Sequence, residues 1–377
     1  MDEHSLECLD FPRVRELLAQ QAMTGLGRRL AGAIQPIARP ELVERWFRQF
    51  DELQRLVDER GLPPLAGITD VRELVAQCAP PLRVTVEDVA RIGDALAGTH
   101  AVTGYLANLP ESMPELAHLA TRIGDFATVA DRIKRVIGND GQVRDDASPK
   151  LARLRAEIVA ATDQIREAVS RLLHDPDIRR LLQYANHTFH NDRLVLPVRT
   201  EYRGRLPGII HRTSDSGATI YIEPSIAVEL NNRISDLRIA ETEEVNRLLW
   251  ELTHEIYLNA TEITRTLDTL AVLDLVAAKV RMARAYDLRC PALLPDSVVQ
   301  LRQARHPLLV DLARQRTAVG QPFEVVPIDV RLGDDFDLLV ITGPNTGGKT
   351  VTLKTVGLLL MMVQAGLPIP VADGSRV

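Results

Sequence analysis

The chain has 377 residues, of which 45% are apolar and 25% charged, enough for two or three soluble domains with buried cores. A net charge of −6 argues against a surface that is basic throughout, although one local basic patch stays compatible with it. Cys8, Cys78 and Cys290 lie far apart and form no C-x-x-C motif, which predicts a reducing compartment and no structural zinc. No signal-peptide segment and no membrane-spanning stretch is present, so we expect a cytoplasmic protein with no membrane partner.

Residues 1–146 are predicted to form a helical core domain. Apolar residues recur at helical spacing over 13–22, 41–59 and 85–106, and prolines separate these runs. The histidines in this part are isolated, and no catalytic constellation stands out. We interpret this domain as scaffold.

Residues 147–186 and 225–290 are predicted to form a long antiparallel coiled-coil arm around a short insert. The second part contains 66 residues without Gly or Pro between Pro224 and Pro291. At 1.5 Å per residue, a helix of that length reaches roughly 90 Å. In the first part, apolar residues alternate steps of three and four, as a coiled-coil seam requires: Leu151, Leu154, Ile158, Ala161, Ile165, Ala168 and Leu172.

The insert, residues 187–224, is predicted to be a small β element that contacts nucleic acid. Short β-type runs cover 193–198, 208–212 and 219–223. The insert is also basic, which suits contact with a phosphate backbone. Its arginines, set against the single acidic residue Glu201 between positions 193 and 212, are Arg193, Arg199, Arg203, Arg205 and Arg212. The alternative is a solvated turn that only joins two helices. Only Tyr202 and Tyr221 could stack on bases, so we do not expect sequence readout.

Residues 291–377 carry the most specific motif of the chain. GPNTGGKT, Gly343 to Thr350, fits G-x-x-x-x-G-K-[ST], the phosphate-binding loop. A β-type run at 336–341 precedes it, and a helix over 350–364 is predicted to follow, with Leu353, Val356, Leu360 and Val363 on one side. Two further strands are expected at 298–304 and 324–330.

This context predicts a nucleotide site. Backbone N–H groups and the positive end of the helix dipole would face a phosphate, Lys349 would reach the β- and γ-phosphates, and the Thr350 hydroxyl would ligate Mg²⁺. The alternative is a Gly-rich turn with a chance lysine, and the strand and helix predicted on either side argue against it.

The extended motif resembles the MutS family of ABC-type ATPases. The resemblance rests on GPNTGGKT, on Arg305-His306-Pro307 and on Gln321-Pro322-Phe323. Two further segments resemble the MutS-II type, which lacks the mismatch-reading domains. They are LECLDFP at 6–12 and HRTSDSGATIYIEP at 211–224, the latter followed by Leu230-Asn231-Asn232. The similarity covers nearly the whole chain.

The resemblance implies a multidomain, mainly α fold. It consists of a helical core, a long antiparallel coiled-coil lever, a small β clamp at its tip and an incomplete α/β ABC-type ATPase domain at 291–377. It implies ATP and Mg²⁺ as cofactors, with Phe323 on the adenine and Thr350 on the metal, and a homodimer of the full-length protein. The cofactor-binding residues it implies are His306, Phe323, Gly343, Pro344, Asn345, Thr346, Gly347, Gly348, Lys349 and Thr350.

Two functions follow from the resemblance. The first is action on branched DNA to suppress homologous recombination, with an endonuclease supplied by a C-terminal Smr domain. The second is binding of rRNA and the splitting of stalled or collided ribosomes. A chromosome-scaffolding coiled-coil ATPase ranks last, because there the phosphate loop precedes the coiled coil.

The chain ends at Val377, before any Walker B carboxylate or Smr domain. We therefore expect a truncated portion that hydrolyses ATP poorly or not at all and has no nuclease activity.

Overall fold

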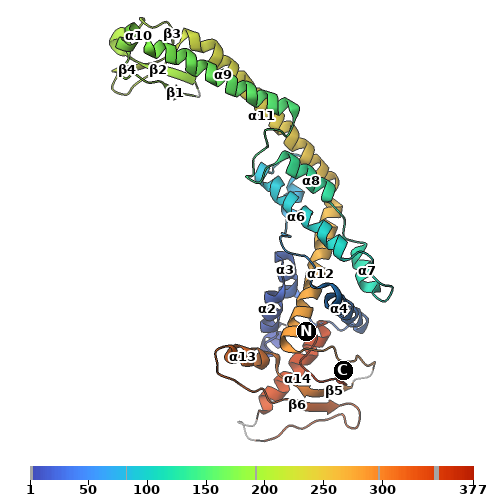
Figure 1. The fold of residues 1–377 in the computed structure, drawn as a ribbon. Helices are drawn as coiled ribbons and strands as arrows, with labels where there is room; N and C mark the ends of the chain where they lie inside the picture. Colours follow the sequence, from blue (N-terminus) through green and yellow to red (C-terminus); the bar gives the residue numbers. More distant parts are fainter. Residues whose placement is uncertain (1–2, 82, 192, 296–297, 344–347) are drawn as a thin grey trace. The chain divides into compact units, whose positions relative to one another are not determined.

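A computed structural model describes residues 3–81, 83–191, 193–295, 298–343 and 348–377. The fold is multidomain and mainly α, as predicted, with two small antiparallel sheets (Figure 1). The chain divides into two compact units. Unit 1 comprises residues 1–83, 91–131 and 256–377, and unit 2 comprises 84–90 and 132–255. The four-part domain division given above stays a prediction.

Unit 1 holds most of the shorter helices and one sheet. Its elements are α1 (Glu3–Cys8), α2 (Phe11–Gln21), α3 (Gly25–Ala33), α4 (Pro40–Arg60), α5 (Arg72–Gln77), α7 (Pro114–Ala120), α12 (Ala260–Tyr286), β5 (Val299–Ala304), α13 (Pro307–Ala318), β6 (Ile328–Leu332) and α14 (Lys349–Gln364). Among the described helices, α6 (Val86–Tyr105) and α8 (Ala127–Val136) run across the unit boundary, as does α11, which is given below with unit 2. The helices expected at 13–22, 41–59 and 85–106 are therefore confirmed as α2, α4 and α6.

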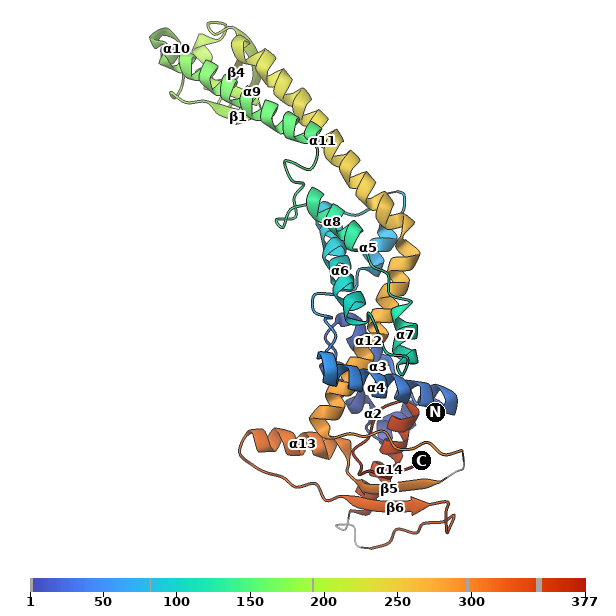
Figure 2. The same cartoon turned by 45° about the vertical axis from the view of Figure 1, so that its right-hand side comes forward.

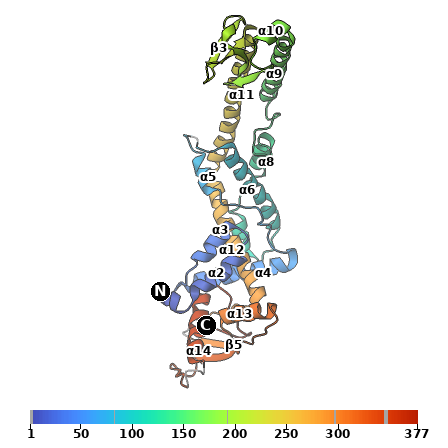
Figure 3. The same ribbon diagram turned by 90° about the vertical axis from the view of Figure 1, so that its left-hand side faces the viewer.

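Helix α12 is the centre of unit 1. It is buried along most of its length, and α2, α3, α4 and α5 pack against it (Figure 3). A buried charge is costly unless it is paired or hydrogen-bonded, so the charged side chains that α12 buries need partners. Two of these, Asp274 and Lys279, are nearly inaccessible to solvent.

Asp274 fixes the start of α3. Its carboxylate accepts the backbone N–H groups of Met23 at 3.0 Å and Thr24 at 2.7 Å, and the Thr24 hydroxyl at 2.7 Å. Arg281 donates to it at 3.2 Å. The Thr24 hydroxyl oxygen in turn caps α3 by accepting the Gly27 N–H. A buried carboxylate is thus fully hydrogen-bonded, and it joins segments 250 residues apart.

Gly27→Ala should destabilise unit 1 by about 2–4 kcal/mol. A Cβ at this position would lie 2.2 Å from Asp274 Oδ2 and 2.8 Å from Asp274 Cβ, so the whole acidic side chain would have to move. Gly32→Ala in the same helix is the control, because nothing lies within 4 Å of its Cβ position. Urea unfolding measures both variants, and equal stabilities would contradict this packing.

Lys279 is 3% exposed, and its ammonium lies 5.5 Å over the Trp46 ring. Burial lowers the pKa of Lys279 from its usual 10.5 to about 8, and the nearby Cys290 thiol opposes this only in part. Between these pH values the unfolded chain binds this proton and the folded chain does not. The contribution of Lys279 to stability should therefore rise from pH 8 to 10.5, whereas the raised pKa of the buried Cys290 thiol acts in the opposite direction above its usual value of 9.0.

Lys279→Met should remove that rise and add stability at pH 7, by at most about 3 kcal/mol. Denaturant unfolding at a series of pH values tests this, with the exposed Lys134→Met as control. A Lys279→Met variant that keeps the wild-type rise between pH 8 and 10.5 would contradict the assignment.

Unit 2 contains the arm and the insert. Its further elements are α9 (Pro149–His174), α10 (Pro176–Leu181), β1 (Thr188–His190), β2 (Arg193–Arg199), the 3₁₀ turn η1 (Thr200–Tyr202), β3 (Gly208–Thr213), β4 (Thr219–Pro224) and α11 (Ser225–Leu258), which ends just inside unit 1.

Helices α9 and α11 run antiparallel, as predicted (Figure 2). Arg155 on α9 pairs with Glu241 on α11 at 2.7 Å. Farther along α9, Ile165 and Val169 share a core with residues from the beginning of α11. The predicted seam is the buried side of α9.

The expected 66-residue helix is interrupted once. Helix α11 ends at Leu258 and α12 begins at Ala260. Asn259 lies between them with φ −97° and ψ 3°, and its N–H bonds to the Ile256 carbonyl three residues back. This tightened turn divides the run without any Gly or Pro.

The insert folds into a four-stranded antiparallel sheet in the order β1-β2-β4-β3. The three predicted runs correspond to β2, β3 and β4, and β1 was not predicted. One face of the sheet packs on α9 and α11 through Leu194, Leu196, Ile220 and Ile222.

In residues 298–343 the predictions hold only in part. The strand at 298–304 is confirmed as β5, whereas the one expected at 324–330 begins later, as β6.

The strand predicted at 336–341 is wrong. Leu338 and Val340 are 78% and 74% exposed, and no described segment pairs with them. A β-type sequence stays irregular where no neighbouring strand receives its hydrogen bonds.

Helix α14 is confirmed, and its predicted apolar side is buried only toward the C-terminal end. Leu353 is 61% exposed, whereas Val363 is buried, and so are Leu358, Leu359 and Met362. Among the described residues, no helix is long and apolar enough to cross a membrane.

Candidate nucleotide and nucleic-acid sites

The N-terminal end of α14 is the candidate nucleotide site. Gly343 and Gly348 have φ values of 141° and 80°, in a region that favours glycine. Helix α14 begins directly after Gly348, and the N–H groups of its first turn have no partner within the helix. These groups and the helix dipole favour an anion at this end. Four predicted contacts, Pro344, Asn345, Thr346 and Gly347, lie outside the described residues.

Lys349 and Thr350 fit a phosphate and its metal ion. Lys349 is half-buried, and within the described part of the chain no carboxylate pairs with its ammonium. Thr350 is exposed, so its hydroxyl is available. The described residues contain no group of three or more His, Cys, Asp or Glu that could hold a metal by itself. A Mg²⁺ here would depend on the nucleotide phosphates for most of its ligands.

Phe323 and His306 lie in other segments of unit 1, outside its helices and strands. Phe323 is half-buried, with the Arg316 guanidinium 5.5 Å from its ring centre. His306 directly precedes α13 and is 8% exposed, and its buried Nδ1 has no hydrogen-bond partner in the described structure. Burial lowers the pKa of His306, while the Asp10 charge raises it and the Lys354 charge lowers it further. Both charged groups therefore act on this ring.

The candidate nucleic-acid interface consists of the insert arginines. Arg203 and Arg205 are exposed, and no described carboxylate pairs with them. Arg199 lies 3.9 Å from Glu201, and Arg212 lies 3.4 Å from Asp215. These exposed pairs contribute little energy and leave the guanidinium groups accessible.

Arg193 is different, because it is held by a buried carboxylate. Glu223 is inaccessible to solvent and accepts two hydrogen bonds from Arg193 Nη1, at 2.7 and 3.0 Å. It also accepts from Asn231 Nδ2 at 2.7 Å and contacts His211 Nε2 at 2.6 Å. Asn232 accepts a further bond from Arg193. Arg193 is therefore fixed by the insert itself.

Sequence reasoning missed this cluster around Glu223. The available signal was a carboxylate directly after the apolar run Thr219–Ile222. A β-bulge also contributes, since the pairing of β3 with β4 shifts register between Ile210 and Arg212. Bulges redirect side chains, and here the bulged residue is His211, which contacts Glu223.

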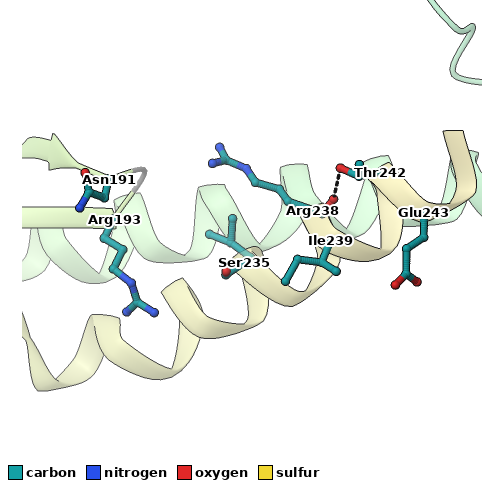
Figure 4. A pocket seen from close by; sticks show the side chains of 8 residues that line it. Asn191, Arg193, Ser235, Arg238, Ile239, Thr242 and Glu243 are labelled. Atoms are coloured by element: carbon teal, nitrogen blue, oxygen red, sulfur yellow. Dashed lines mark hydrogen bonds between the residues drawn. The ribbon is translucent and has the colours of Figure 1, made fainter. Parts of the chain in front are cut away.

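A groove of about 400 Å³ lies beside this cluster, between the start of β2 and α11. Figure 4 shows Arg193 on one side and the α11 side chains on the other, with the Thr242 hydroxyl donating to the Arg238 carbonyl. The groove thus gives a ligand access to an arginine that is already held in place. Its lining residues are Asn191, Arg193, Ile234, Ser235, Arg238, Ile239, Thr242 and Glu243.

Comparisons with known proteins cover the whole chain. It is 35% identical over 377 residues to the endonuclease MutS2 of Pelotomaculum thermopropionicum, matching all of this chain and 46% of that protein. It is 37% identical over 379 residues to endonuclease MutS2 of Geobacillus thermodenitrificans, and 34% over 380 residues to that of Bacillus cytotoxicus. Each match covers all of this chain and 47% of the relative. The chain belongs to the MutS2 family.

The predicted family is thereby confirmed. The chain spans about half the length of the curated MutS2 relatives it matches. No protein-family model matches it.

Glu223→Gln should loosen the insert by about 2–4 kcal/mol, because it leaves the charge of Arg193 without its buried counter-ion. Hydrogen exchange of residues 193–224 should accelerate in this variant. Glu201→Gln is the control, because it removes an exposed carboxylate of the same insert. Unchanged protection in Glu223→Gln would contradict the role given to this cluster.

Proposed function

We propose that this chain is the lever, clamp and partial ATPase portion of an ATP-dependent, nucleic-acid-binding MutS2-type protein. The observation that carries the proposal is the start of α14. There a left-handed glycine, a lysine that no carboxylate of the described residues pairs with and an exposed threonine meet at a helix N-terminus. Few other ligands suit this arrangement as well as the phosphates of a nucleotide.

In this proposal Lys349 and the N–H groups of the first turn bind the nucleotide phosphates, and Thr350 contacts Mg²⁺. When bound, Mg²⁺ neutralises phosphate charge. Pro344 to Gly347 close the loop, Phe323 stacks on the adenine and His306 supports the site from α13. In this proposal the 377-residue chain binds nucleotide through these residues.

The insert is the proposed clamp on nucleic acid. Arg199, Arg203, Arg205 and Arg212 supply mobile positive charge for the phosphate backbone. Arg193, held by Glu223, supplies a fixed charge at the edge of the groove. Contacts of this kind position a nucleic acid without reading its sequence.

For the whole protein we propose action on branched DNA as a cytoplasmic homodimer. The relatives' name, endonuclease MutS2, supports a DNA substrate and a nuclease activity of the complete protein. An rRNA or ribosome substrate is the competing outcome, and a preference that depends on the 2′-OH group would identify it.

Lys349→Ala should weaken binding of Mg·AMPPNP by about tenfold or more, because it removes a charge-assisted contact with the phosphates. Isothermal titration calorimetry of the chain measures this, with the exposed Lys134→Ala as control. Equal affinities of Lys349→Ala and wild type would place the nucleotide elsewhere. Measurable ATP turnover that Lys349→Ala abolishes would contradict the expected lack of hydrolysis.

Replacing Arg199, Arg203 and Arg205 together by Gln should weaken nucleic-acid binding and flatten its salt dependence. The slope of log K against log salt should fall by about 2 to 3 for three lost phosphate contacts. The matched control replaces three exposed arginines of α9 by Gln as well. These are Arg153, Arg166 and Arg171. An unchanged slope in the insert variant would show that its arginines do not touch phosphates.

A further inference from the structure

The groove between the start of β2 and α11 has the size of a ligand pocket. Its volume is about 400 Å³, within the range of roughly 300–1,000 Å³ that ligand sites occupy. All of its lining residues belong to unit 2. A space of this size suits a single nucleotide. A duplex cannot place one there, because its bases are stacked and paired.

One end of the groove carries positive charge. Arg193 lies there, and its Nη1 and Nη2 groups donate to Glu223 and Asn232. A guanidinium has five N–H donors, and among the described residues nothing accepts from the Nε–H of Arg193. Because Glu223 offsets the charge of Arg193, a second cation is needed to attract a phosphate. Arg238 of α11 lines the same groove and supplies it (Figure 4).

The other end of the groove carries negative charge. Glu243 follows Ser235 by eight residues, which corresponds to about 12 Å along the α11 axis. Its carboxylate is exposed and repels a phosphate, whereas it accepts hydrogen bonds from the N–H groups of a base or the O–H group of a sugar. The two ends therefore orient a nucleotide, with its phosphate at Arg193 and its base toward Glu243.

The middle of the groove is apolar. Ile234 is 7% exposed and belongs to the core that joins α11 to the sheet, whereas Ile239 is 57% exposed. A sugar ring or the face of a base would remove the Ile239 side chain from water. The lining side chains include no aromatic ring on which a base could stack. Apolar contact of this kind does not depend on which base is present.

We propose that this groove binds one nucleotide of an unpaired strand. Arg193 and Arg238 contact its phosphate, Ile239 packs against its sugar and base, and Glu243 faces the base end. The inference deepens the proposed clamp and rests on it, because the insert arginines bring the nucleic acid to the groove. It gives the clamp a preference for forks, flaps and gaps over plain duplex, since these present unpaired nucleotides.

Fluorescence anisotropy with the 377-residue chain tests the groove, using a single-stranded oligothymidine and a blunt DNA duplex of equal length. Arg238→Gln should weaken binding of the single strand by about fivefold or more, because a charge-assisted phosphate contact is lost. Binding of the duplex should stay nearly unchanged. Arg233→Gln is the matched control. Arg233 is exposed on the same helix, pairs with Glu157 of α9 at 3.6 Å and does not line the groove.

A second variant fills the groove and leaves its charges in place. Ser235 is exposed on α11 and lines the groove, so Ser235→Phe puts a large side chain into the space of the nucleotide. This variant should also lower the affinity for the single strand and spare the duplex. Asn246→Phe is its control, because Asn246 is exposed on the same helix outside the groove.

The outcomes separate the groove from the clamp. Equal effects of Arg238→Gln and Arg233→Gln, or an equal loss of single-strand and duplex binding, would overturn the groove and leave the clamp intact. A wild-type chain that prefers the duplex would do the same. Failure of the wild type to bind either probe would overturn both proposals. Circular dichroism checks folding, and if Arg238→Gln does not fold, Ser235→Phe decides the question.

Discussion

The burial of Glu223 is the constraint on which the candidate nucleic-acid interface depends. A carboxylate without solvent access is tolerated only when donors surround it, and here they come from β2, from the bulged residue of β3 and from α11. The same contacts fix how the sheet meets α11. They also distinguish Arg193, which a buried carboxylate holds in place, from insert arginines that are exposed to solvent. Charge burial thus links the stability of unit 2 to its binding surface.

In unit 1, too, charged side chains connect segments that lie far apart in the sequence. Asp274 accepts hydrogen bonds from the start of α3 and holds it on α12, while the half-buried Lys354 pairs with Asp10 and connects α14 to the residues before α2. In both cases a charged side chain joins segments that are distant in sequence. The nucleotide end of α14 is therefore supported by the N-terminal residues as well as by its neighbours in sequence. Leu9 and Asp10 therefore belong to the surroundings of the candidate site, although they carry no phosphate-binding motif.

Local patterns predicted the helices, three strands of the insert and the start of α14, because periodicity and Gly-rich turns are local properties. The sequence did not indicate which strands pair with one another. The run at 336–341 has a β-type sequence and is irregular, because no described strand accompanies it. Leu353 belongs to the predicted apolar side of α14 and is nevertheless exposed, because the burial of a helix depends on what packs against it. Glu223, Lys354 and Asp10 were missed because long-range charge pairs leave no spacing signature.

The most direct test of this account is a competition for the chain between a four-way DNA junction and a structured rRNA fragment of equal length, at physiological salt, with and without Mg·AMPPNP. The account predicts that the junction wins and that nucleotide changes its affinity, because it proposes that the nucleotide site of α14 and the insert arginines act in one ATP-dependent protein. Preference for the rRNA would contradict the DNA substrate. Junction binding that is indifferent to nucleotide would contradict the coupling between the two sites.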